Sequence, residues 1–210
     1  MNELVSANFL VFWLPLGIFA VMLGYILVHR QFRLSERTID EVTVFLRRID
    51  WDETREVFDL ARERTLRGVL SDEHFRRTMR IRIHEVREFL SRMYHNVRVL
   101  HEWANTELGD ILDKPVNECS ERENQIRAIA DRAAYFRVLT GLRLCKVTFW
   151  TLLRIERLPF VRIPSVAALR RCGEQGELDL VEMYGQLREA AGNLALRYGK
   201  QVQDDMLAVL

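Results

Sequence analysis

The chain contains 210 residues, with 31 lysines and arginines against 30 aspartates and glutamates and a formal net charge of +1. This near-neutral balance argues against a nucleic-acid-binding protein, because such proteins usually carry a clear basic excess. The three cysteines are far apart and form no Cys-x-x-Cys pair, which argues against a disulfide scaffold and a thiolate metal site. Only three of the basic residues are lysines, a bias typical of GC-rich genomes, so we expect a bacterial source.

The most informative segment is an uncharged run of twenty residues from Phe9 to Val28. Twenty helical residues span about 30 Å, the thickness of the hydrocarbon core of a bilayer. Trp13 and Tyr25 lie near the two ends of the run, where aromatic side chains favour the headgroup region. We therefore predict a transmembrane helix over residues 9–28. The alternatives are a cleaved signal peptide, which needs a basic start and a shorter apolar core, and a buried soluble helix.

Basic residues set the predicted orientation of this anchor. Residues 1–8 contain no lysine or arginine, whereas several arginines follow soon after the apolar run. The positive-inside rule places these arginines in the cytoplasm. We therefore expect residues 1–8 outside the plasma (inner) membrane, residues 29–34 as a basic juxtamembrane linker, and residues 35–210 as a cytoplasmic helical domain.

The longest predicted helix covers residues 71–115. Its apolar residues recur in steps of three and four from Phe75 to Ile111, the spacing of a coiled-coil seam or a long bundle helix. Shorter helices are predicted before it, near residues 35–49 and 52–68.

A second long helix is predicted over residues 117–157, and a last helix runs from about residue 178 to the C-terminus. No segment alternates with a period of two, so we expect no sheet. The predicted fold is all-α: one N-terminal transmembrane helix followed by a cytoplasmic antiparallel helical bundle with two or three long helices.

The second half of the 117–157 helix is apolar on most faces, as is typical of a helix at the centre of a bundle. Residues 138–172 carry a net charge of +6, and residues 173–210 a net charge of −4. We therefore expect these two segments to pack together, with the aromatic residues between 146 and 162 in the core. The alternative is docking on an anionic membrane surface through Trp150, Arg154, Arg157 and Phe160.

Two further patterns indicate contact surfaces. Arg76, Arg80 and Arg87, with His84 between them, share one helical face that would suit anionic lipid or an acidic partner, or would simply be solvated. Three glycines, Gly185, Gly192 and Gly199, lie seven residues apart in the predicted last helix. Glycine costs about 1 kcal/mol against alanine inside a helix, so we expect close packing along this stripe, with chance placement as the alternative.

No catalytic motif is present in the sequence. The chain lacks His-Glu-x-x-His, Glu-x-x-His, Gly-x-Ser-x-Gly, phosphate-loop and dinucleotide-binding patterns. We therefore predict no cofactor and no metal, and a non-enzymatic protein. The expected function is a single-pass membrane-anchored scaffold or interaction protein, which contacts the bilayer through residues 9–28 and binds a protein partner or itself through its helices. The alternatives are an anionic-lipid-binding module and an enzyme whose site is assembled from scattered residues.

Overall fold

The computed structural model describes residues 39–109, 120–152, 164–172 and 178–210. The predicted transmembrane segment 9–28 and its flanks 1–8 and 29–34 lie outside these residues. Within the described part of the chain, no helix combines the length and apolar character needed to cross a bilayer. The described residues belong to one compact unit that begins at Arg37.

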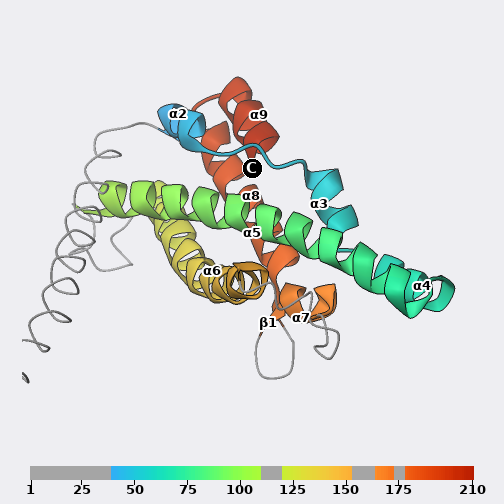
Figure 1. Ribbon diagram of the computed structural model, residues 1–210. Helices are drawn as coiled ribbons and strands as arrows, with labels where there is room; N and C mark the ends of the chain where they lie inside the picture. Colours follow the sequence, from blue (N-terminus) through green and yellow to red (C-terminus); the bar gives the residue numbers. More distant parts are fainter. Residues whose placement is uncertain (1–38, 110–119, 153–163, 173–177) are drawn as a thin grey trace, which may run out of the picture. The chain divides into compact units, whose positions relative to one another are not determined.

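The described residues form an all-helical bundle with one very short strand pair (Figure 1). In chain order its elements are α2 (Ile39–Val42), the 3-10 helix η1 (Thr43–Phe45), α3 (Trp51–Val57), α4 (Leu60–Val69), α5 (Asp72–Leu108), α6 (Glu121–Leu152), α7 (Val166–Arg170), β1 (Arg171–Cys172), β2 (Leu178–Asp179), α8 (Leu180–Leu196) and α9 (Lys200–Val209). The predicted all-α class and the two predicted long helices are confirmed.

An antiparallel pair, α5 and α6, forms the centre of the bundle. An ion pair between Arg122 and Glu107 joins the start of α6 to the end of α5. At the other end, the Arg87 guanidinium donates to the Thr151 hydroxyl at 3.2 Å. The buried side of α5 is the apolar repeat seen in the sequence: Met79, Ile83, Val86, Leu90, Met93, Val97, Leu100, Ala104 and Leu108. The seam therefore serves packing inside the domain and is not available for an intermolecular coiled coil.

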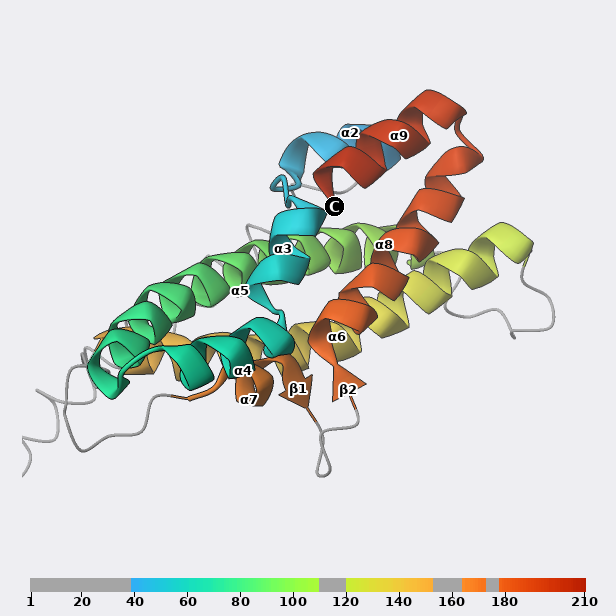
Figure 2. The same ribbon diagram turned by 90° about the vertical axis from the view of Figure 1, so that its right-hand side faces the viewer.

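The last two helices form a hairpin against the central pair. Helix α8 packs on α6, and α9 folds back along α8 (Figure 2). The Tyr184 ring of α8 lies against Phe136 of α6, with ring centroids 5.7 Å apart. Its hydroxyl accepts a hydrogen bond at 3.1 Å from Asn96, which is fully buried in α5. The three helices thus share one core, and burial of the phenol raises the pKa of Tyr184.

Two side chains of α5 hydrogen-bond to the backbone of the segment at and after η1. Asn96 accepts from the Arg47 amide at 2.7 Å and donates to the Arg47 carbonyl at 2.8 Å. One ring nitrogen of His95 hydrogen-bonds to the Phe45 carbonyl at 2.9 Å. Because a buried amide without partners is costly, Asn96 fixes where this extended stretch sits.

Two arginines hold the corner between α3 and α4. Arg82, buried in α5, donates to the carbonyls of Val57 at 2.9 Å and Asp59 at 2.6 Å. Arg170 of α7 donates to the Phe58 carbonyl at 3.0 Å. The carbonyls of Val57 and Phe58 belong to the end of α3, where a helix leaves acceptors unpaired, and the Asp59 carbonyl belongs to the N-cap of α4, so the two cations tie the end of one helix to the start of the next. The single helix predicted over residues 52–68 is therefore wrong, because the chain breaks at this corner.

Two other predictions are wrong. The last helix is interrupted at Gly199, whose φ of +129° and ψ of 153° favour glycine strongly and separate α8 from α9. The expectation of no sheet fails at β1 and β2, which pair antiparallel with Arg171 opposite Asp179. An ion pair between Arg170 and Asp179 links the residue before β1 to the end of β2. The strands were not predicted because two residues per strand are too few to give a period-two pattern.

Candidate functional site

The outward side of α6 carries an apolar stripe, which we call the α6 stripe. It consists of Tyr135, Val138, Leu142, Cys145, Phe149 and Leu152. The thiol-bearing Cys145 is exposed, and the other five side chains are between 51% and 73% exposed. Successive members lie 3, 4, 3, 4 and 3 residues apart, which places all six on one side of the helix. A contiguous apolar patch that a folded domain leaves exposed often marks an interaction site.

The opposite side of α6 is also apolar, and it packs inside the bundle. Its buried residues are Ile126, Ile129, Ala130, Ala133, Phe136, Thr140 and Val147. The second half of the helix therefore has two apolar sides, and the bundle covers one of them. The prediction that the aromatic residues of this half lie in the core is wrong for the two that the structure describes: Phe149 is exposed and Trp150 is half-buried.

The charges along the α6 stripe are mainly basic, and the exposed Asp131 lies one turn before its first member, Tyr135. Between residues 132 and 152, α6 carries Arg132, Arg137, Arg143 and Lys146 and no acidic residue. Arg132 and Lys146 are exposed, and the Arg143 guanidinium donates to the carbonyl of Arg171 at 2.8 Å. The surface is thus an apolar ridge with basic flanks.

Comparisons of the chain with protein-family models, with curated proteins and with solved structures found no match.

The predicted basic face on α5 is not one continuous surface. Arg87 is half-buried and bonds to Thr151 at the end of α6. Arg76 and Arg80 instead line an open recess between the start of α5, α4 and the residues before α7. The structure thus divides these three arginines between a helix contact and a recess.

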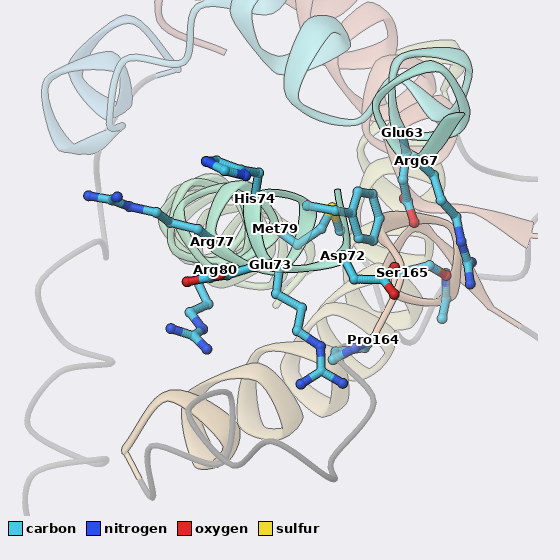
Figure 3. Close-up of a pocket in the computed structure, with 13 residues that line it drawn as sticks. Glu63, Arg67, Asp72, Glu73, His74, Arg77, Met79, Arg80, Pro164 and Ser165 are labelled. Carbon is cyan, nitrogen blue, oxygen red and sulfur yellow. The ribbon is translucent and has the colours of Figure 1, made fainter. Parts of the chain in front are cut away.

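The recess lacks the features of a ligand site. Its lining combines four arginines with three acidic residues, and Figure 3 shows the labelled arginine side chains pointing in different directions. Glu63 is already engaged, because its carboxylate accepts from the Val166 amide at 2.9 Å. Within the described residues, no group of histidine, cysteine, aspartate or glutamate side chains could hold a metal ion.

Three of the predicted membrane-contact residues, Arg154, Arg157 and Phe160, lie outside the described residues. The fourth, Trp150, lies beside the α6 stripe and is half-buried. The stripe itself was missed in the sequence, although its spacing is visible there. The signal was hidden because the inner positions of the same helix are also apolar, so periodicity could not say which side the bundle covers.

The three predicted packing glycines have different surroundings. A Cβ atom on Gly185 would lie 3.3 Å from the Trp51 ring, and one on Gly192 would lie 2.8 Å from the Leu207 side chain. Gly199 lies outside both helices and faces open space. Close packing therefore surrounds two of the positions, and the third is set by backbone conformation.

Two titratable groups with shifted pKa values have structural partners. Burial and the neighbouring Arg137 lower the pKa of His101, so the neutral imidazole is favoured at neutral pH. Burial alone would raise the pKa of Asp179, but the hydrogen bond and charge of Arg170, with the amides of Val181 and Glu182, lower it overall. His101 of α5 contacts Arg137 of α6 and Asp179 pairs with Arg170, and neither belongs to a group of three or more potential metal ligands among the described residues.

Proposed function

We propose that this chain is a single-pass membrane protein whose helical domain is a non-enzymatic interaction module. Residues 9–28 would cross the inner membrane, residues 1–8 would lie outside, and the domain from residue 35 onward would lie at the cytoplasmic face. The observation that carries the proposal is the α6 stripe, a continuous apolar surface that the bundle leaves exposed.

The sequence and the structure support different halves of this proposal. The uncharged run and the arginines after it support the anchor and its direction. The α6 stripe supports an interaction module, because folding alone gives no reason to expose five large apolar side chains on one helix face. The domain would act by recruitment, since an anchor raises the local concentration of whatever its surface binds.

The anchor is tested by extraction and by cysteine labelling of the full chain in bacterial inner-membrane vesicles. The labelled site is Asp204→Cys on an exposed position of α9, in a background with the native cysteines replaced by serine. We expect the protein to resist alkaline carbonate, and the thiol to react with an impermeant reagent in inverted vesicles only. Release by carbonate, or reaction in right-side-out vesicles only, would overturn the anchor or its direction.

A further inference from the structure

We propose that the α6 stripe is a docking surface for an anionic lipid bilayer, so that the helical domain lies on the membrane that anchors it. This inference rests on the proposed anchor and names the partner of the same surface.

The chemistry of the α6 stripe suits a bilayer surface. Helices that lie on bilayers bury an apolar side in the boundary between headgroups and acyl chains, with aromatic residues and basic flanks. The α6 stripe has Tyr135 near one end and Phe149 near the other, and the exposed Arg132 and Lys146 lie along it. Anionic headgroups would pair with these cations while the apolar side chains leave water.

The rival occupant of the α6 stripe is a second copy of the chain. A symmetric contact of α6 with its own copy would bring four basic residues of each helix together, and residues 131–152 offer one carboxylate, that of Asp131, to pair with them. Like charges placed across a helix pair weaken it. The charge pattern therefore favours an anionic surface over self-association.

The tether between the predicted transmembrane span and the helical domain is short. Ten residues, 29–38, separate the end of the predicted span from the first described residue, Ile39. A fully extended chain of that length reaches about 35 Å, so the domain cannot move far from the bilayer. A weak surface contact then suffices, because the anchor keeps the effective concentration of the membrane high.

Cys145 gives a direct probe, since it is an exposed member of the stripe. The full chain with Cys119→Ser and Cys172→Ser would carry a nitroxide spin label on Cys145. It would be reconstituted in vesicles of phosphatidylcholine alone and of phosphatidylcholine mixed with phosphatidylglycerol. Electron paramagnetic resonance then compares collisions of the label with oxygen, which concentrates in lipid, and with a water-soluble nickel chelate.

We expect the anionic vesicles to raise the oxygen-to-nickel collision ratio several-fold, and high salt to reverse the change. A label on Asp204→Cys, in the background without native cysteines, should show no such change. A Cys145 label that stays equally accessible to nickel in both lipids would overturn the proposal. Dipolar broadening between Cys145 labels in both lipids would also overturn it, because it would identify a second copy as the occupant.

Matched charge variants distinguish a loss of docking through α6 from a general effect of adding a carboxylate to the domain. Leu142→Glu places a carboxylate in the stripe and should abolish the anionic-lipid effect. Ile81→Glu makes the same kind of change at an apolar residue of α5 that is 58% exposed, and should leave the effect intact. Lys146→Glu should weaken docking and reduce its dependence on salt. Loss of docking in Ile81→Glu to the same extent as in Leu142→Glu would contradict a specific role for α6.

The two proposals can fail separately. Alkaline carbonate extraction reports on the anchor, and neither Leu142→Glu nor Lys146→Glu should change it. The collision ratio at Cys145 reports on docking and is measured before extraction. A protein that washes off the vesicles but shows the anionic-lipid effect would refute the anchor and support the surface. A protein that resists extraction but shows no change in the collision ratio with anionic lipid would support the anchor and refute docking through the α6 stripe.

Discussion

Helix α5 and the second half of α6 are both rich in apolar residues, but the bundle treats them differently. Helix α5 places its apolar residues on one side, and that side is buried. The second half of α6 is apolar on two sides, of which one is buried and the other exposed. The difference shows that the apolar content of a helix indicates how much of its surface is best kept from water. It does not show whether the rest of the domain or another molecule covers that surface.

The strongest test of this contrast makes the same substitution on each helix. Leu100 of α5 is fully buried, and Leu142 of α6 is 66% exposed. We expect Leu100→Glu to cost several kcal/mol, a large share of the roughly 5–15 kcal/mol that holds a typical domain folded. Leu142→Glu should change the free energy of unfolding by less than about 0.5 kcal/mol. Urea denaturation of the full chain, followed by tryptophan fluorescence, measures both; equal losses would show that the α6 stripe is covered.

A second pair of variants compares a buried and an exposed arginine of α5. Arg82→Met removes the donors to the Val57 and Asp59 carbonyls, so we expect a loss of about 2–4 kcal/mol. Arg92→Met removes a surface ion pair with Glu88, which is worth about 0.5 kcal/mol or less. Denaturant midpoints of the two variants give the comparison. Similar midpoints would mean that Arg82 does not hold the α3–α4 corner.

The contrast between packed and open surroundings extends to two glycines. Gly192→Leu would push a side chain into Leu207, and we expect a loss of about 1–3 kcal/mol. Gly68 in α4 has no atom within 4 Å of an added Cβ, so Gly68→Leu should raise stability by about 0.5–1 kcal/mol through helix propensity. Thermal unfolding followed by circular dichroism measures both. Unchanged stability in Gly192→Leu would show that α9 does not pack closely on α8.

The smallest expected effect is the pH dependence of the contact between α5 and α6. The pKa of His101 lies below its ordinary 6.5, so the fold favours the neutral ring. This contribution is fully present above pH 6.5 and is lost as the pH falls from 6.5 through the lowered value. We expect His101→Gln to flatten the stability profile in that window. The lowered pKa of Asp179 acts in a more acidic window, because its contribution is lost as the pH falls from about 3.8. A profile that His101→Gln leaves unchanged would assign the acid dependence to other groups.

The features that followed from local periodicity could be predicted from the sequence. The repeat from Phe75 to Ile111 predicted α5, and its buried side matches the repeat. The separation between α5 and α6 could be predicted because Pro115 ends the pattern. Helix existence is a local property, so one chain segment contains the necessary information.

The features that were missed depend on contacts between distant segments. Arg82 looks like a surface cation in the sequence, yet it is buried because carbonyls 23 to 25 residues earlier accept its hydrogen bonds. The break at Gly199 was missed because the apolar spacing runs across it. The α6 stripe was missed because both sides of α6 are apolar, and only the packed bundle shows which side remains open.

The bond between the Ile49 amide and the Val209 carbonyl, 3.0 Å long, joins the two ends of the domain. The central pair forms from neighbouring segments, whereas this contact closes a loop that contains almost every other element. Long loops lose more chain entropy on closure, and contacts of this kind form late in folding. Native-state hydrogen exchange should therefore find the earliest and last helices of the domain opening together, at a lower free energy than the α5–α6 pair. Partial unfolding at the contact between Ile49 and Val209 would expose the α8–α9 hairpin while leaving the α6 stripe in place.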